Sequence, residues 1–286
     1  MDRFEGKVAV ITGAGSGFGR EFAKKGAALG MKLVLADLDT AGLSATVEAV
    51  RAQGGDAIGV TTDVSDAAQV EALAQASLDT YGGAHLLFNN AGVGAGGFVW
   101  ENSANDWQWV FGVNVMGVAN GLRAFVPIML KQNEPAHIVN TASVAGLLAA
   151  PAMGVYNASK HAVVALTETL HHDLRLAGAS LVGVSLLCPA FVPTGIADAE
   201  RSRPEALANA APHTASQKVA ARQLTRAVEG GRLSARDIAE LTFDAVRERR
   251  FYVITHPNIM PSVQLRLDDI AQLRNPTDPM SLKQPR

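Results

Sequence analysis

Tyr156 and Lys160 stand four residues apart in the stretch "VYNASKHAV" (155–163), and the residues between them are small. If this stretch is helical, residues i and i+4 lie about one turn apart on the same face. The Lys160 ammonium then lies near the Tyr156 hydroxyl, where its charge favours the phenolate and lowers the pKa of the tyrosine. In this way tyrosine, whose ordinary pKa is about 10, can act as an acid and a base near neutral pH. A surface helix that carries both residues by chance would show the same spacing, so the rest of the chain has to decide.

A glycine-rich turn, "ITGAGSGFGR" (11–20), lies between an apolar segment typical of a β-strand and a segment with helical spacing. Glycines permit positive φ angles and a close backbone approach, so main-chain N–H groups and the helix N-terminus can face a pyrophosphate. Many turns of this kind use glycine only for packing. The turn alone is therefore a weak indication of a dinucleotide site.

Asp37 strengthens that indication, because it ends the next predicted strand at about the separation expected for a ribose-binding carboxylate. A carboxylate there accepts hydrogen bonds from the adenosine hydroxyls and repels a 2′-phosphate. No Arg or Lys precedes Arg20 in the glycine turn, and none directly follows Asp37. We therefore expect NAD rather than NADP; the alternative is that Asp37 only caps a loop.

The elements that must position these residues alternate along the whole chain. Near-continuous apolar strands separated by helices predict a parallel sheet that is covered on both faces. Right-handed crossovers then give a Rossmann-type, doubly wound α/β sheet with ligands at the carboxyl ends of its strands. The predicted strands are 7–13, 32–37, 56–64, 84–92, 136–143, 180–189 and 251–255, and the predicted helices are 19–30, 41–54, 66–82, 103–131, 156–178 and 234–250.

Composition limits the remaining functions. With 286 residues, 48% of them apolar, and no repeat or linker, the chain fits one α/β domain. A formal net charge of −2 gives no electrostatic case for nucleic acid or an anionic membrane. The single cysteine, Cys188, excludes a disulfide framework, and no metal site is expected. No uncharged apolar run suggests a membrane span and no signal peptide precedes the first strand, so a cytoplasmic protein is expected.

With further residues at strand ends, the pattern resembles the short-chain dehydrogenase/reductase family over about residues 5–195, and less distinctly to about 255. The family's T-G-x-x-x-G-x-G pattern begins at Thr12, and Ser143 precedes Tyr156 by the thirteen residues that the family requires. The resemblance implies that Tyr156 is the general acid/base and that Lys160 lowers its pKa and holds the nicotinamide ribose. It also implies that Ser143 polarises the substrate carbonyl and that Asn114, a poor helix former in a predicted helix, supports a water relay.

The resemblance also implies a set of cofactor contacts at the carboxyl ends of the strands. They are Gly13, Ser16, Gly17, Phe18, Gly19, Asp37, Asp63, Val64, Asn90, Ala91, Gly92, Tyr156, Lys160, Pro189, Val192 and Thr194. The chain departs from the family at one point, where Pro189-Ala190 stands in place of Pro-Gly. We therefore expect a local difference beside the nicotinamide rather than a loss of cofactor binding.

The segments expected around the substrate, 93–101, 144–154 and the chain from Phe191 onward, contribute almost no charge. The expected pocket residues are Ser143, Leu147, Met153, Tyr156 and Phe191. They favour a hydrophobic secondary alcohol or ketone, aromatic ones included. Residues 195–233 are expected to form a helical lid. The tail at 256–286 could cover either that lid or a neighbouring subunit.

Three functions follow. The first is NAD-dependent interconversion of a secondary alcohol and its ketone, in a homodimer or homotetramer as the family resemblance implies. The second is carbonyl reduction with NADP. The third is a non-catalytic dinucleotide sensor that keeps the fold, although such proteins often lose the tyrosine, lysine or serine that this chain retains.

Overall fold

The chain folds around one sheet of seven parallel strands in the computed structural model, which describes residues 1, 3–279 and 281. The strand order is β3-β2-β1-β4-β5-β6-β7. The strands are β1 Val8–Thr12, β2 Lys32–Asp37, β3 Asp56–Thr61, β4 Leu86–Asn89, β5 Ala136–Thr141, β6 Val182–Cys188 and β7 Tyr252–Ile254. The predicted doubly wound α/β sheet is confirmed, although β3 and β4 end before the predicted boundaries.

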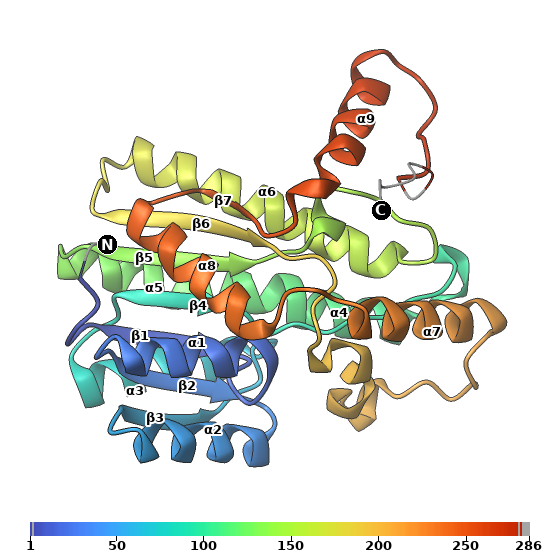
Figure 1. Cartoon of the computed structure of the whole chain (residues 1–286). Helices are drawn as coiled ribbons and strands as arrows, with labels where there is room; N and C mark the ends of the chain where they lie inside the picture. Colours follow the sequence, from blue (N-terminus) through green and yellow to red (C-terminus); the bar gives the residue numbers. More distant parts are fainter. Residues whose placement is uncertain (2, 280, 282–286) are drawn as a thin grey trace.

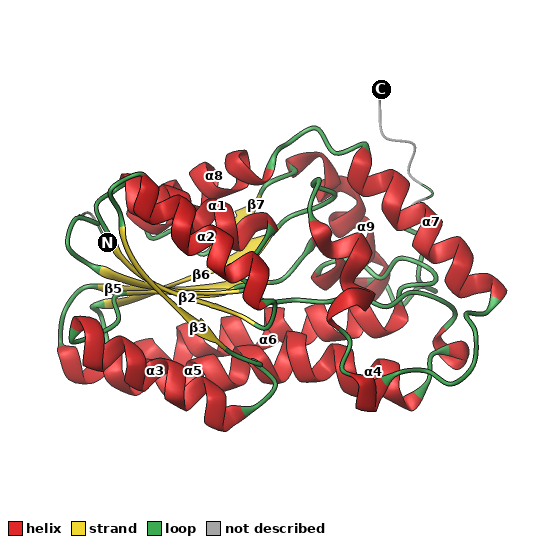
Figure 2. Cartoon of the chain, turned by 90° about the horizontal axis from the view of Figure 1, so that it is seen from below, coloured by secondary structure: helices red, strands yellow, loops and turns green. Residues whose placement is uncertain are grey.

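Helices cover both faces of the sheet (Figures 1 and 2). One layer holds α1, α2 and α8, and the opposite layer holds α3, α5 and α6. The helices are α1 Gly17–Ala28, α2 Thr40–Ala52, α3 Ala67–Tyr81, α4 Ala104–Phe111, α5 Gly117–Gln132, α6 Gly154–Leu176, α7 Ala215–Glu229, α8 Ala235–Glu248 and α9 Met260–Ala271. Successive strand residues point to opposite faces, so Ile11 packs in the α1/α8 core and Val10 in the α3/α5 core.

Side-chain caps begin several of these helices where the sequence places them. Asp66 caps α3 by accepting a hydrogen bond from Ala68 N, and Ser234 with Asp237 forms a capping box at the start of α8. The long helix predicted over 103–131 is divided, because a π-helical turn, Gly112–Met116, separates α4 from α5. Such turns insert one residue into the α-helical hydrogen-bond pattern and often lie at functional sites.

The stretch Ala104–Gln132 is also long and apolar enough to cross a membrane by length and composition, with a mean hydropathy of 1.4. The sequence expectation considered only uncharged runs and therefore overlooked it. The core helix of a globular protein passes the same test. This stretch buries Asn114 and Asn120, and α5 packs on α3 and β4.

The lid and the tail lie beyond the carboxyl ends of the strands. Residues 195–233 form two short 3-10 segments, Gly195–Ser202 and Glu205–Leu207, followed by α7, so the expected helical segment is present. Helix α9 stands away from the sheet on the side of β7 (Figure 1). The tail residues 280 and 282–286 lie outside the described residues.

Candidate active site

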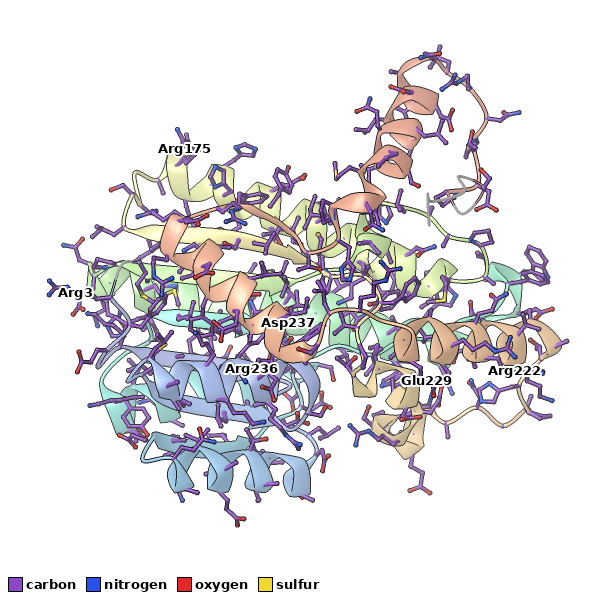
Figure 3. The ribbon with its side chains drawn as sticks, in the orientation of Figure 1. Arg3, Arg175, Arg222, Glu229, Arg236 and Asp237 are labelled. Atoms are coloured by element: carbon purple, nitrogen blue, oxygen red, sulfur yellow. The ribbon has the colours of Figure 1, made fainter. Side chains whose placement is uncertain are left out.

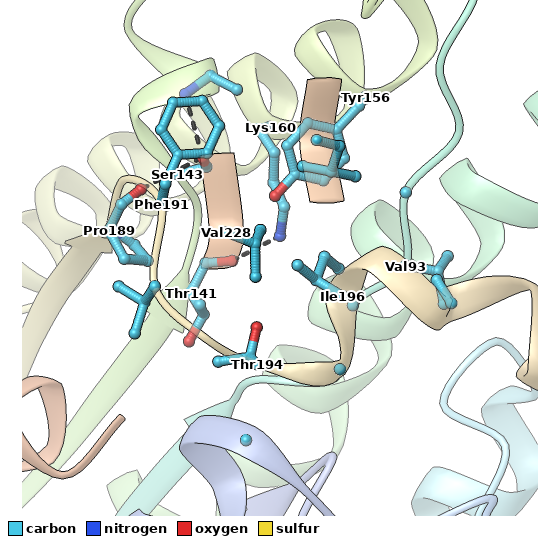
Figure 4. Close-up of a pocket in the computed structure, with 18 of the residues that line it drawn as sticks. Val93, Thr141, Ser143, Tyr156, Lys160, Pro189, Phe191, Thr194, Ile196 and Val228 are labelled. Carbon is cyan, nitrogen blue, oxygen red and sulfur yellow. Dashed lines mark hydrogen bonds between the residues drawn. The ribbon is translucent and has the colours of Figure 1, made fainter. Parts of the chain in front are cut away.

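A cavity of about 1830 Å³ opens at the carboxyl ends of the strands. It begins beside Asp37, at the end of β2, passes Tyr156 and Lys160 on α6, and reaches His256, just after β7. All seven strands point in the same direction, so residues far apart in the sequence meet at this edge. Figure 4 shows the central part of the cavity.

The glycine turn forms one wall of this cavity through conformations that other residues adopt with strain. Gly13 and Gly17 have φ angles of +66° and +49°. A Cβ atom on Gly13 would lie 2.9 Å from Ala91 Cα, and one on Gly17 would lie 3.3 Å from Thr194 Cβ. Gly19 is different: it does not line the cavity, and a Cβ atom there would collide with the Gly13 carbonyl oxygen. The structure thus places Gly19 where α1 packs against the turn, and its cofactor contact stays a prediction.

The Asp37 carboxylate lines the cavity and is held by two backbone groups. Its Oδ2 accepts a hydrogen bond from Gly15 N at 2.7 Å, and its Oδ1 accepts one from Asp39 N at 2.9 Å. Arg20, the nearest cation in the turn, instead donates to Gly15 O and Thr46 Oγ1. The carboxylate is thus oriented toward the cavity, where a ribose hydroxyl can donate to its remaining lone pairs.

The other predicted cofactor residues gather around the same cavity. Thr12 links two strand ends, since its hydroxyl accepts hydrogen bonds from Asn90 N and Ala91 N while Asn90 Nδ2 donates to Thr12 O. The predicted residues that line the cavity are Gly13, Ser16, Gly17, Phe18, Asp37, Asp63, Val64, Asn90, Ala91, Gly92, Tyr156, Lys160, Pro189, Val192 and Thr194. A close backbone cradle, a helix N-terminus and a fixed carboxylate in one cavity fit a dinucleotide.

Tyr156 and Lys160 lie on the cavity side of α6, as their spacing predicts (Figure 4). Lys160 is only 3% exposed; its Nζ donates to Thr141 O at 2.9 Å and lies 5.7 Å from the centre of the Tyr156 ring. Burial lowers the pKa of Lys160 to about 8. Burial also raises the pKa of Tyr156, although its hydrogen bond with Ser143 acts in the opposite direction. The expected lowering of the tyrosine pKa by Lys160 is therefore not seen: burial dominates, and the opposing effect comes from Ser143.

Ser143 presents its hydroxyl beside Tyr156 just after β5. Its Oγ accepts a hydrogen bond from Ala145 N at 3.1 Å, which begins a 3-10 turn, Val144–Gly146. The same hydroxyl is within 3.3 Å of Pro189 O, to which it donates. Two hydroxyl groups, those of Ser143 and Tyr156, thus lie together at the cavity. Ser143 has a single hydroxyl hydrogen, so it can donate to a carbonyl or alkoxide oxygen only when it releases Pro189 O.

Asn114 lies in the π turn and is fully buried. Its Oδ1 accepts a hydrogen bond from Val93 N, and its Nδ2 donates to both Val93 O and Ser159 Oγ, at 2.9–3.0 Å. The amide therefore joins the segment after β4 to α6 close to Lys160. Both amide hydrogens are used by protein groups, so any water relay has only the second lone pair of Oδ1 available.

Four of the five predicted substrate residues line the cavity: Ser143, Met153, Tyr156 and Phe191. Leu147 does not, and this prediction is wrong in position. The turn after Ser143 packs Leu147 against two apolar clusters, one with Val164 and one with Ile259, and Leu148 lines the cavity.

Sequence reasoning also missed charged residues in this wall. Arg201, Arg203 and Arg232 line the cavity, so the expectation of almost no charge beyond Phe191 is wrong. Arg203 is neutralised, since its guanidinium lies 2.8 Å from Asp106 and 2.7 Å from Glu200. No residue spacing marked these arginines; only the packing of the lid brings them to the cavity.

The tail forms another wall that the sequence left undecided. His256, Asn258, Ile259, Ser262, Asp278 and Pro279 line the cavity. Ala190 N donates to His256 Nδ1 at 3.3 Å, so in the neutral ring the proton is on Nε2. The rule that ligands bind at the carboxyl ends of strands could have identified His256, because it follows β7 directly. Among residues 1, 3–279 and 281, no three His, Cys, Asp or Glu side chains cluster as metal ligands.

Comparisons with known proteins agree with this geometry. The model of the short chain dehydrogenase family matches residues 7–205, and the chain belongs to this family. A crystal structure of a short chain dehydrogenase/reductase from Burkholderia phymatum in complex with NAD is 70% identical, with a TM-score of 0.97 over 99% of this chain and 100% of the other.

Two named relatives are more distant. A CLA biosynthesis dehydrogenase/reductase from Lactiplantibacillus plantarum is 34% identical over 94% of this chain and 95% of its own length. A 1-deoxy-11-beta-hydroxypentalenate dehydrogenase from Streptomyces exfoliatus is 32% identical over 92% of this chain and 88% of its own length. The chain is thus a family oxidoreductase similar to enzymes that act on hydroxyl or carbonyl groups.

Proposed function

We propose that this protein uses NAD(H) to interconvert a bulky, hydrophobic secondary alcohol and its ketone, with Tyr156 as the general acid/base. The observation that carries the proposal is the arrangement of Ser143, Tyr156 and Lys160 in one cavity with the glycine turn and Asp37. These groups join a proton-transfer site to a site that fits a dinucleotide.

In the proposed reaction, a bound nicotinamide cofactor supplies the hydride chemistry. The chain's own residues handle the proton and the charge. Ser143 and Tyr156 donate hydrogen bonds to the substrate oxygen, and during alcohol oxidation the Tyr156 phenolate accepts the hydroxyl proton. The Lys160 ammonium, fixed by Thr141 O, favours that phenolate and is placed to hold ribose hydroxyls.

The substrate class follows from the walls of the cavity. Leu148, Met153, Phe191 and Val228 surround the substrate side, and the whole cavity is large. This composition supports an apolar substrate with few hydrogen-bonding groups. The similar protein from Streptomyces exfoliatus is named a 1-deoxy-11-beta-hydroxypentalenate dehydrogenase, and the compound in that name bears a hydroxyl group.

For the cofactor, Asp37 favours NAD, because a carboxylate at the ribose repels a 2′-phosphate. The solved relative in complex with NAD supports the same choice. NADP-dependent carbonyl reduction is the second candidate, and direct comparison of NADH and NADPH affinity separates the two.

We also propose that the protein is a homodimer or homotetramer. Exposed apolar side chains on or beside α5 and α6 support this assembly, including Met116, Leu130 and Leu176, which are 50%, 43% and 89% exposed. Such a surface is available for contact with a second copy.

The first experiment measures NADH formation from NAD⁺ with a panel of aliphatic, aromatic and steroid secondary alcohols, in native protein and in Tyr156→Phe. We expect turnover by Tyr156→Phe to be at least about 10³-fold lower than turnover by native protein, because the acid/base is lost. NADH affinity, measured by fluorescence titration, should remain unchanged. Near-normal turnover by Tyr156→Phe would show that another group transfers the proton. If native protein binds NADH but oxidises no alcohol of the panel, the sensor alternative gains support.

A further inference from the structure

Arg201 brings a positive charge from the lid to the adenosine half of the cavity. Its guanidinium lies 3.6 Å from the Asp39 carboxylate, just after β2. A Cβ atom on Gly195 would lie 3.4 Å from Arg201 Nη2 and 3.9 Å from Ser16 Oγ. One side chain therefore lies beside the start of the lid, the glycine turn and the turn after β2.

These three elements surround the place where the cofactor phosphates would lie. Ser16 and Gly17 stand at the N-terminus of α1, where backbone N–H groups favour an anion. Asp37 marks the ribose position, and all these residues line the same cavity as Arg201. The first 3-10 segment of the lid, Gly195–Ser202, thus closes over the adenosine side as well as the substrate side.

Among the described residues, the other cationic side chains that line the cavity either bond to other protein groups or lie in another part of the cavity. Lys160 donates to Thr141 O near the tyrosine, and Arg203 is paired with Asp106 and Glu200. Arg232 follows Gly231, which packs on Phe191 and Pro193 near the nicotinamide side. Arg201 is 54% exposed and pairs with Asp39 at a long distance, which makes that ion pair weak and easily exchanged.

We propose that Arg201 is a cofactor-holding residue whose guanidinium pairs with the pyrophosphate of the dinucleotide, so that the first turn of the lid fastens onto the bound cofactor. A planar guanidinium binds phosphate through two parallel hydrogen bonds and keeps its charge at every accessible pH. Asp39 competes for the same guanidinium and holds it near the site. This inference rests on the proposed binding of NAD(H), and it ties cofactor release to movement of the lid.

The test measures affinities by calorimetry for NADH, ADP and adenosine, and NADH dissociation rates by stopped-flow fluorescence. The proteins are native, Arg201→Ala, Arg201→Lys and the control Arg222→Ala. Arg222 lies on α7 (Figure 3), is exposed and does not line the cavity, so the control removes the same charge from the lid. Arg201→Ala should weaken the binding of NADH and of ADP about tenfold or more, because a charge-assisted hydrogen bond is lost. It should also accelerate NADH release. Adenosine affinity should not change, Arg201→Lys should recover part of the loss, and Arg222→Ala should stay within about twofold of native protein.

Asp39→Asn provides a second variant that keeps the helix intact. Asp39 caps α2 by accepting a hydrogen bond from Gly42 N, and asparagine is an equally good cap. Removal of the competing charge should leave ADP binding as tight as in native protein or tighter. Weaker ADP binding in this variant would contradict the proposed exchange of partners.

Other outcomes overturn the inference in distinguishable ways. NADH and ADP affinities within twofold of native protein in Arg201→Ala would show that Arg201 forms only a surface ion pair, while the proposed function stands. An equal loss for adenosine would place the effect on the ribose or on lid structure rather than on the pyrophosphate. Failure of native protein and Arg222→Ala to bind NADH would overturn the proposed function and this inference together.

Discussion

At the scale of single residues, the proposed proton-transfer pair, Tyr156 and Lys160, depends on an ammonium group that water scarcely reaches. Lys160 is 3% exposed, and its Nζ donates a hydrogen bond to Thr141 O. Because burial disfavours the charged form, the pKa of Lys160 falls to about 8. The pKa of Tyr156 rises for the same reason, because burial disfavours its charged form. The pair therefore carries an energetic cost that an exposed Tyr–Lys pair would not have.

That cost predicts a pH-dependent stability. Between about pH 8 and pH 10.5, the ordinary pKa of lysine, the unfolded chain holds a proton on Lys160 that the folded chain has lost. Since the unfolded state binds more protons there, the contribution of Lys160 to the free energy of unfolding should rise with pH across this window, by at most about 3 kcal/mol. Cys188 acts in the opposite direction above its ordinary pKa of about 9, because burial raises its pKa to about 12, so the Lys160 contribution is the difference between native protein and the variant that follows. Lys160→Met should remove that rise. Urea unfolding of both proteins at several pH values from 7 to 10.5 measures it.

A matched control is Lys218→Met, which removes an exposed lysine on α7. This control should keep the pH dependence of native protein. If Lys160→Met and native protein changed in stability by the same amount from pH 8 to 10.5, the Lys160 charge would not be disfavoured by the fold.

Local spacing predicted some site residues and could not predict others. Tyr156 and Lys160 share a helix face, so four residues of sequence sufficed. Sequence placed Leu147 in the pocket because it does not show how the 3-10 turn after Ser143 directs each side chain, and this turn brings Leu148 to the cavity. Arg201 reaches the cavity only through tertiary packing, and no motif surrounds it, whereas the position of His256 directly after β7 was the one available signal.

At the scale of elements, the lid is fixed to the body of the protein at two places. Arg203 lies over the Trp109 ring, 4.1 Å from its centre, and bonds Asp106 of α4, which is 2% exposed. Near the start of α7, the Glu101 carboxylate accepts hydrogen bonds from Thr214 and Ser216 at 2.5 Å. Movement of the lid is therefore expected to be confined to the segments between and around these attachments.

Arg203→Met should loosen the first attachment. It leaves Asp106 buried without its cationic partner, a change that typically costs about 3–5 kcal/mol. We expect a lower melting temperature and faster hydrogen–deuterium exchange over residues 195–209, measured by mass spectrometry. Exchange in β1–β6 should change little, because the attachment lies outside the sheet.

The double variant Asp106→Asn/Arg203→Met separates charge from packing. It should be more stable than Arg203→Met alone, since no unpaired charge is left buried. If both variants were equally destabilised, the stacking of Arg203 on Trp109 would be the main contribution. Unchanged exchange over 195–209 in both would contradict the role of Arg203 as an attachment.

Most elements could be predicted because hydrophobic periodicity and capping residues are local. Asp66 and Ser234 mark helix starts that the structure reproduces. The π turn at Asn114 could not be predicted, since apolar spacing continues through it and only the poor helix propensity of asparagine was visible. Its cause is tertiary: Val93 and Ser159 satisfy the amide.

At the scale of the whole molecule, the sheet places the proposed cofactor contacts mainly at the ends of β1–β4 and the proposed substrate contacts mainly on the segments after β5–β7. The tail lies on the proposed substrate side. Ile259 and Val263 pack with Leu148, and Ser262 donates a hydrogen bond to Pro279 O. The alternation of strands and helices predicted this sheet, whereas the position of the tail depends on packing that no periodicity encodes.

A chain that ends at residue 257 tests the division between the two sides. We expect NADH affinity within about threefold of native protein, because the removed residues lie away from the glycine turn and Asp37. The KM for an alcohol found with the panel should rise at least about tenfold, since one wall of the cavity is lost. Light scattering should give the same number of subunits as for the full chain, because the proposed contact surface lies on α5 and α6.

Two results would contradict this picture. A large loss of NADH affinity would show that the tail also supports the cofactor side. Dissociation of the shortened chain into monomers would place the subunit contact on α9 rather than on α5 and α6.

The π turn between α4 and α5 has a consequence for how this chain can change by insertion and deletion. It holds one residue more than an α-helix of the same rise, and α5 continues in the resulting register. Gly117 and Gly121 then meet Val64 and Asn89 so closely that neither can carry a Cβ atom. Deletion of one residue from 112–116 can therefore convert the turn into an ordinary α-helix of the same rise and leave these contacts in place. Deletion of one residue within α5 would instead rotate one part of the helix against the other by about 100°. A single-residue deletion should therefore be tolerated better in the π turn than within α5.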